Sequence, residues 1–243
     1  MRFFFLLCCL FSLHLTAQSI SGEAIFETEA ASVMTFDSTS RMSQQQQQQI
    51  NERMRKAMRK QYRLVFNAFE GLYKQVPKLA TPSAEKEMNV IGLGQGVDGG
   101  LYKDTKRGVL VETRDMFGKL FLIEDTLVRP DWKILEEQKD IQGYTCYKAE
   151  LPTKFGSTTA WFTPDIPVNL GPGSYWGLPG FILQADNGRL RITCTELTIN
   201  GKETVTVTPP TKGKSISQAE YEELYTKKIV EMQRMHDKEG DGQ

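Results

Sequence analysis

The chain has 243 residues, and its 30 lysine and arginine residues balance 30 aspartate and glutamate residues, leaving no formal net charge. This balance gives no basic excess for nucleic acid or for an anionic membrane surface, so neither partner is expected. The length is sufficient for one sizeable core or two small ones.

The first residues, MRFFFLLCCLFSLHLTA, have the pattern of a secretory signal peptide. Arg2 precedes an apolar run, and Ala17 is the small residue expected at a cleavage site. The run is shorter than the roughly 20 residues that span a bilayer. We therefore expect cleavage after Ala17 and no integral membrane segment in the mature chain. Leucines rather than small residues precede Cys8 and Cys9, which argues against lipidation there.

An antiparallel β domain with one helix is expected over residues 18–212. A first strand is predicted at 20–31, and apolar residues at helical spacing predict an amphipathic helix over about 42–61, with polyglutamine as its first turns. Periodicity alone leaves YRLVFNAFEGLYKQV open between helix and strand. Residues 76–100 hold two prolines and several glycines, which indicates a loop.

From residue 100 onward, short strands alternate with turn residues. Such a series predicts an antiparallel meander, with Asn187-Gly188 as the strongest hairpin signal. The capping box of Ser217 and Glu220 then begins a terminal helix within 213–243, followed by a disordered tail from about Asp237. The fold class is therefore mainly β (α+β), a curved antiparallel meander with one packed helix and a C-terminal helix. The predicted strands are 100–106, 107–115, 118–127, 132–141, 143–151, 157–164, 180–186 and 189–199.

Cys146 and Cys194 are the cysteines that remain after cleavage. An exported chain meets oxidising conditions, which permit a disulfide. Two buried thiols are the alternative. We predict the disulfide.

The mature chain has one histidine, His236, at the edge of the predicted tail. Nucleophile activation by serine or cysteine and the usual zinc sites need positioned imidazole or thiolate groups, which this chain lacks. Met232, Met235 and His236 could bind a soft copper ion, but methionines along a helix more often pack. No metal, cofactor or catalytic residue is therefore assigned.

Two further patterns bear on possible chemistry. The glycines at 94–99 spell G-x-G-x-x-G, but a strand–turn–strand pattern follows where a dinucleotide site needs a helix. Two carboxylates could form a glycosidase-like acid pair, although no spacing singles out a pair and solvated charges are the favoured interpretation. The carboxylates considered were Glu112, Asp115, Glu124, Asp125, Glu136, Glu137 and Asp165.

Prolines and glycines concentrate in WFTPDIPVNLGPGSYWGLPGFILQADNG, between the strand ending at Thr163 and the one starting near Phe181. The fixed φ of proline and the conformational freedom of glycine predict a stiff crossing segment anchored by Tyr175 and Trp176. We favour a loop that closes one end of the sheet. The alternative is a recognition loop that presents Trp176.

The same run carries a family resemblance. It resembles the signature of the GLPGLI family of exported bacterial proteins, with phenylalanine in place of the fifth-position leucine, and I-x-G-Y-x-C-x-K-A at 141–149 is similar too. The resemblance covers about 60–200, and its Y-x-L-x-F pattern favours a strand at 62–66. It implies the cell envelope of Gram-negative bacteria and a curved half-barrel like that of periplasmic lipoprotein carriers. It supplies no activity. The motif loop consists of Tyr175, Trp176, Gly177, Leu178, Pro179, Gly180, Phe181 and Ile182.

These observations predict a non-enzymatic periplasmic module that binds an apolar ligand or a protein partner on the concave face of its sheet. An interaction subunit of an outer-membrane system is the first alternative. A histidine-free carboxylate hydrolase is the second.

Overall fold

The computed structural model describes residues 20–32, 34–35, 42–77, 99–154, 156–200 and 205–240, so the predicted signal peptide lies outside the described residues. Two runs of consecutive strands make up most of this part of the chain. The first run is β1 (Ser21–Ala30), β2 (Gln61–Asn67), β3 (Glu70–Gln75), β4 (Leu101–Asp104), β5 (Val109–Met116) and β6 (Lys119–Thr126). The second run is β7 (Lys133–Ile141), β8 (Tyr144–Thr153), β9 (Gly156–Thr163), β10 (Phe181–Asp186) and β11 (Leu190–Asn200).

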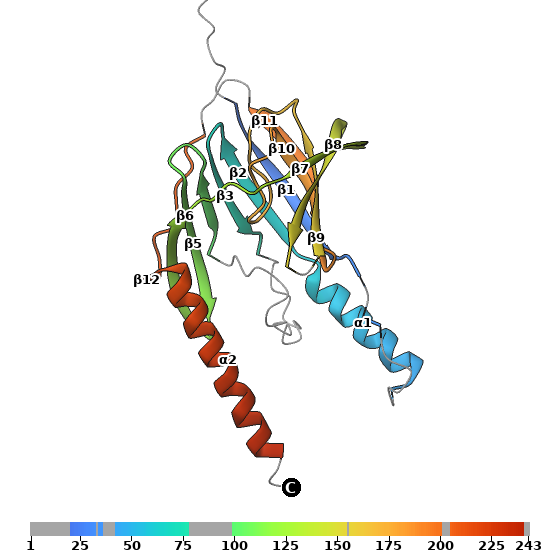
Figure 1. Cartoon of the computed structure of the whole chain (residues 1–243), viewed down its shortest axis with the longest axis vertical. Helices are drawn as coiled ribbons and strands as arrows, with labels where there is room; N and C mark the ends of the chain where they lie inside the picture. The colour runs from blue at the N-terminus through green and yellow to red at the C-terminus, as the bar shows by residue number, and fades with distance from the viewer. Residues whose placement is uncertain are drawn as a thin grey trace, which may run out of the picture.

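All these strands belong to one curved sheet (Figure 1). Its order is β12-β6-β5-β4-β3-β2-β1-β11-β10-β9-β8-β7, where β12 (Lys214–Ile216) is a short edge strand parallel to β6. Antiparallel pairing of β1 with β11 joins the two meanders. The predicted mainly β fold is confirmed. Strand β12 was not predicted, because three residues are too few to show a strand pattern.

The hairpins form where the sequence placed turn residues. Phe117-Gly118 and Gln142-Gly143 both have positive φ at each position, 53° and 83° in the first pair and 54° and 78° in the second. Two consecutive residues with positive φ match the right-handed twist of the strands they join. The ambiguous stretch after residue 61 is the hairpin of β2 and β3, so the strand at 62–66 is confirmed.

Two helices flank the sheet. Helix α1 (Gln44–Met58) begins at Ser43 with a capping box to Gln46, so the polyglutamine does form its first turns. It ends three residues before the expected boundary because Gln61 already belongs to β2. Helix α2 (Gln218–Gly240) begins at the predicted Ser217 cap and continues past Asp237, where a tail was expected.

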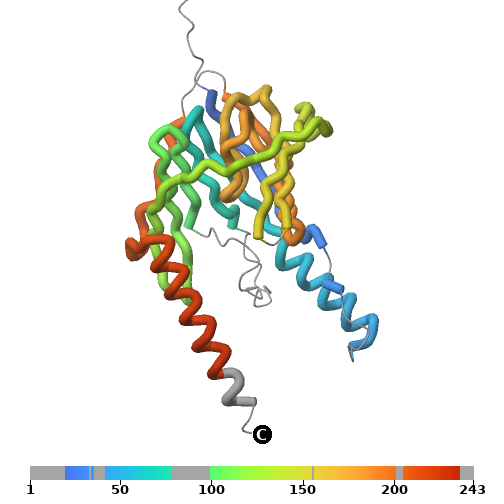
Figure 2. The backbone as a smooth tube through the Cα atoms, in the orientation of Figure 1, coloured from blue at the N-terminus to red at the C-terminus, as the bar shows by residue number. Residues whose placement is uncertain are grey.

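The concave side of the sheet holds the main core. Phe26, Leu64 and Phe66 from β1 and β2 are fully buried there. The hollow is filled by residues 164–180, called here the crossing segment, rather than by α1, of which only Met58 is buried. Figure 2 also shows the connection from β6 to β7 running across the front of the sheet.

Candidate functional site

The crossing segment is an internal layer of the core. Its Ile166, Val168 and Leu170 are at most 2% exposed and pack in the main cluster, and Leu178 packs in a second cluster with Phe162. Burial of these side chains removes apolar surface from water and fixes the segment to the sheet. The motif residues therefore contribute to the closure of the hollow.

Within the motif, Pro179 is exposed, Tyr175 is half-buried, and the remaining residues are buried. Trp176 is 7% exposed. Its carbonyl accepts a 2.8 Å hydrogen bond from Nε1 of Trp132, and Arg129 donates to the carbonyl of Gly177 at 3.0 and 3.2 Å. The connection from β6 to β7 thus holds the motif in place.

The position of Gly180, just before β10, requires a glycine. A Cβ atom there would lie 2.1 Å from the carbonyl oxygen of Thr163 and 2.9 Å from the nitrogen of Pro164. Neither backbone atom can move freely, because Thr163 is the last residue of β9. Only glycine allows the chain to pass this point and enter β10.

Lys103 is a fully buried lysine beneath the crossing segment. Its Nζ donates to three backbone carbonyls, those of Gly171 at 3.0 Å, Gly173 at 2.7 Å and Tyr175 at 3.0 Å. Burial lowers the pKa of Lys103 to about 7, because the ammonium group has lost its water. All three of its donors are used, so Lys103 acts as a structural anchor rather than an accessible amine.

The two cysteines lie in the same core cluster as buried free thiols. Burial raises the pKa of Cys146 to about 11 and that of Cys194 to about 12, with the negative charge of Cys146 as a further contribution to the second. The disulfide of the exported protein stays a prediction.

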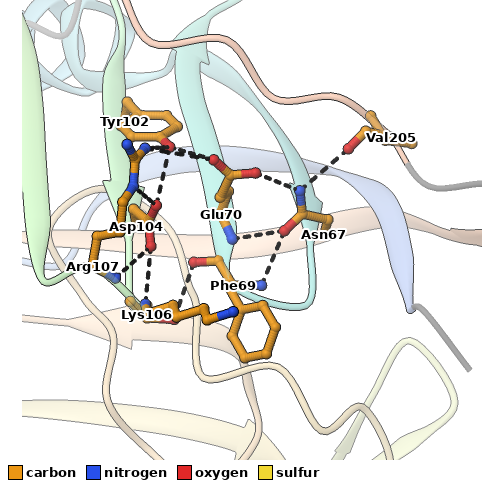
Figure 3. A network of polar contacts seen from close by, with 9 residues as sticks. Asn67, Phe69, Glu70, Tyr102, Asp104, Lys106, Arg107 and Val205 are labelled. Carbon is orange, nitrogen blue, oxygen red and sulfur yellow. Dashed lines mark hydrogen bonds and ion pairs between the residues drawn. The ribbon is translucent and has the colours of Figure 1, made fainter. Parts of the chain in front are cut away.

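The buried carboxylates form ion pairs in the sheet. Around Tyr102, the hydroxyl donates to Glu70 at 2.5 Å, and Arg107 contacts Asp104 from its side chain and its backbone (Figure 3). Burial alone would raise the pKa of Asp104, but the hydrogen bonds from Arg107 and Lys106 outweigh it and lower the pKa. A carboxyl with a lowered pKa is a poor proton donor at neutral pH.

Glu112 is the buried member of the carboxylates considered from the sequence. It is 3% exposed, and its Oε2 lies 2.6 Å from Nη2 of Arg114. Its neighbour in the same strand, Asp115, caps the turn at Gly118. These arrangements are typical of structural ion pairs and turns.

A polar cleft of about 630 Å³ is lined by residues of β7–β11. Lys148, Trp161 and Gln184 form one cross-strand row along its floor, while the row formed by Ala149, Ala160 and Ala185 is buried on the other face. The outer cleft, as this site is called below, is lined by Lys139, Lys148, Ser157, Thr159, Trp161, Gln184, Asp186, Gly188 and Arg191.

Three cations in the outer cleft differ in their partners. Lys148 lies 2.9 Å from Glu137, and Nε of Arg191 lies 2.9 Å from Asp186. The ammonium of Lys139 instead lies 4.1 Å from the ring centroid of Trp161 and donates to Gln184.

No carboxylate in the described ranges lies within ion-pair distance of Lys139. Burial, followed by the positive charge of Arg191, lowers the pKa of Lys139. Lys139 is therefore a partly desolvated cation whose charge is not neutralised by direct contact with an acid.

Sequence reasoning missed Lys103, Lys139 and Trp161. A lysine in a short strand normally faces solvent, and the alternating charges of β7 are typical of a solvated face. The one local signal was the alternation along β9, where Trp161 lies between the buried Ala160 and Phe162 and therefore points to the opposite side of the strand.

The copper and dinucleotide patterns, both disfavoured on sequence grounds, lie only partly within the described residues. Met232 and Met235 are exposed on α2, and the side chain of His236 lies outside the described residues. Most of the glycine motif at 94–99 is likewise outside them. Among the residues that the structure describes, no three histidine, cysteine or acidic side chains gather to hold a metal ion.

These features define a mainly β protein in which a curved antiparallel sheet is closed by a glycine- and proline-rich segment. A family model described as a protein of unknown function (Porph_ging) matches residues 152–184, from the end of β8 into β10. This matched part contains the motif loop. The chain is therefore similar to an uncharacterised family over this segment, and the match assigns no activity.

Two solved structures of PNGF-II, in the P21 and C2 space groups, are similar in fold. Their TM-scores are 0.52 and 0.53, at 13% and 12% sequence identity. The likeness covers 87% of this chain but only 34% and 33% of theirs, so the chain spans about a third of the solved chains. No curated protein matches the sequence. No helix in the described ranges is long and apolar enough to cross a membrane.

Proposed function

We propose that this protein is an exported, non-enzymatic binding module of the Gram-negative cell envelope, related to the GLPGLI proteins, and that it binds a ligand bearing a carboxylate in the outer cleft. The observation that carries the ligand proposal is Lys139, a cation placed on Trp161 without an acidic partner in contact. A ligand carboxylate would supply that partner, and Arg191 would add attraction.

The outer cleft is preferred to the concave face for a physical reason. An apolar ligand in the hollow would have to displace Ile166, Val168 and Leu170, which are already buried there. The volume of the outer cleft, about 630 Å³, lies within the range of small-molecule sites. The ammonium of Lys139 and the amide of Gln184 provide convergent polar groups, and the ring of Trp161 provides an apolar surface beside them.

Calorimetric titration of the mature chain with N-acetylated, C-amidated tri-glutamate tests the ligand proposal, with identically capped tri-glutamine as the neutral match. We expect tri-glutamate to bind and added salt to weaken it. Lys139→Met keeps the aliphatic stem on Trp161 and should weaken binding at least tenfold. Lys119→Met, at an exposed position on β6, should leave it unchanged. Equal binding of both peptides, or no binding, would overturn the proposal.

Export is tested separately. Mass spectrometry of the protein from the envelope fraction should find Gln18 at the N-terminus, because Ala17 is the small residue after the apolar run. A chain that begins at a lipid-bearing Cys8 or Cys9, or one found only in the cytoplasm, would reject the proposed processing.

A further inference from the structure

Strand β9 presents a row of side chains to the outer cleft. Ser157, Thr159 and Trp161 are accessible and alternate with buried residues, so their side chains share one side of the strand. Successive members of this β9 row lie roughly 6.6 Å apart along the strand. The outer cleft therefore extends along β9, with an indole at one end and two hydroxyls leading away from it.

The two hydroxyls of the β9 row are not used by the fold. In the part of the chain that the structure describes, no side-chain hydrogen bond is made by the hydroxyl of Ser157 or Thr159. Ser157 is exposed and Thr159 is half-buried. A hydroxyl both donates and accepts hydrogen bonds, so each of the two offers a ligand both kinds of contact.

The Trp161 end of the row is cationic. Lys148 is the cross-strand neighbour of Trp161 on β8. The ammonium of Lys139 lies over the indole and donates to Gln184, the neighbour of Trp161 on β10. Cations that converge on a partly desolvated site favour a ligand carboxylate at this end.

Thr159, the next position of the row, has acidic neighbours instead. Glu150 lies beside it on β8 and Asp186 lies beside it on β10. Glu150 is 3.5 Å from Lys148, and Asp186 is 2.9 Å from Arg191. A second ligand carboxylate here would meet like charges on both sides. A neutral hydroxyl would instead donate to the lone pairs that these ion pairs leave free.

We propose that the ligand of the outer cleft is an acidic saccharide, whose single carboxylate contacts Lys139 and whose neutral sugar unit lies along Thr159 and Ser157. The inference rests on the proposed function and adds the chemical class of the ligand. A sugar hydroxyl donates to a carboxylate and accepts from a serine or threonine hydroxyl, so one sugar ring satisfies both kinds of group. The C–H groups of the acidic sugar also suit the half-buried indole of Trp161.

Calorimetric titration of the mature chain with cellobiouronic acid, a glucuronate linked to glucose, tests this assignment. Cellobiose is the matched neutral disaccharide, because it has a hydroxymethyl group where the acid has its carboxylate. We expect the acid to bind at least tenfold more tightly than cellobiose. Lys139→Met should remove most of that difference, because the carboxylate loses its cation.

A double variant, Ser157→Ala with Thr159→Val, tests the sugar contacts separately from the carboxylate contact. It removes both hydroxyls and keeps every charge, so it should weaken cellobiouronic acid at least tenfold. The ratio of its dissociation constant to that of the capped tri-glutamate should shift at least fivefold against the saccharide. Thr126→Val, at an exposed position on β6, is the control and should change neither constant. Thermal melts would check that each variant is folded.

The outcomes distinguish this inference from the proposed function. Binding of tri-glutamate without binding of cellobiouronic acid, or with equal binding of cellobiose, would overturn the saccharide assignment and leave the carboxylate site standing. Equal weakening of both acidic ligands by the double variant would also overturn it, because the β9 row would then serve any acid. Failure of both acidic ligands to bind would overturn the proposed function and this inference together.

Discussion

The ammonium of Lys103 donates a hydrogen bond of 2.7 Å to the carbonyl of Gly173, seventy residues further along the chain. The same ammonium also serves Gly171 and Tyr175. Lys103→Met removes these bonds and leaves carbonyls of the crossing segment without donors. We expect a loss of about 2–4 kcal/mol in the free energy of unfolding at pH 6, measured with urea.

Lys74→Met is the control for this substitution, because Lys74 is exposed on the neighbouring strand β3. It should change the free energy of unfolding by less than about 0.5 kcal/mol. Equal midpoints for Lys103→Met and the wild type would mean that the anchor contributes nothing.

The titration of Lys103 predicts a pH dependence. Its pKa falls from 10.5 to about 7 on folding, so between these values the unfolded chain holds one more proton than the folded chain. The free energy of unfolding should therefore rise with pH across this window, by up to about 1.4 kcal/mol per unit. Lys103→Met lacks this contribution, so the stability difference between wild type and variant should grow from pH 7 to pH 9. A constant difference would contradict the lowered pKa.

Trp176→Ala tests the packing of the motif. The ring is 7% exposed, and its loss should reduce the free energy of unfolding by about 3–5 kcal/mol. Val128→Ala, at a side chain that is 77% exposed, should leave the melting temperature nearly unchanged. If Trp176→Ala had the same melting temperature as the wild type, the ring would not contribute to packing and would be available for recognition instead.

Gly180→Ala should be far more harmful than Gly118→Ala. Both glycines have positive φ, but a Cβ at Gly118 meets nothing within 4 Å, whereas one at Gly180 lies 2.1 Å from a carbonyl oxygen. We expect about 1–2 kcal/mol for Gly118→Ala from backbone strain. A larger loss, or failure to fold, is expected for Gly180→Ala. Similar thermal melts for the two variants would show that the backbone at the end of β9 shifts readily to admit a Cβ atom.

Cys146 and Cys194 should be joined in protein recovered from the envelope. The bond would close a loop of roughly 48 residues and stabilise the fold by about 4 kcal/mol in the chain-entropy model. Alkylation in denaturant without reductant should label neither cysteine, and prior reduction should expose both. Two labelled cysteines without reductant would leave them as the buried thiols of the structure.

Local pattern was sufficient for most of the elements. The strands from residue 100 onward and the helix cap at Ser217 were predicted because each depends on residues only a few positions apart. Alternation and turn chemistry act at that range. The boundaries shifted where a neighbouring element took over, as when β2 began at Gln61.

The sequence by itself therefore determined a mainly β chain with a stiff glycine–proline segment before Phe181. Only the tertiary structure showed that this segment fills the hollow of the sheet. The contacts that hold it there are long-range: Lys103 donates to its carbonyls from about seventy residues away, and β1 pairs with β11 from near the other end of the chain. The pairing of β7, β8, β9 and β10 placed Lys139 on Trp161 and formed the outer cleft. Periodicity in the sequence shows which side of a helix or strand is apolar. Contacts between residues far apart in the chain determine what that side packs against.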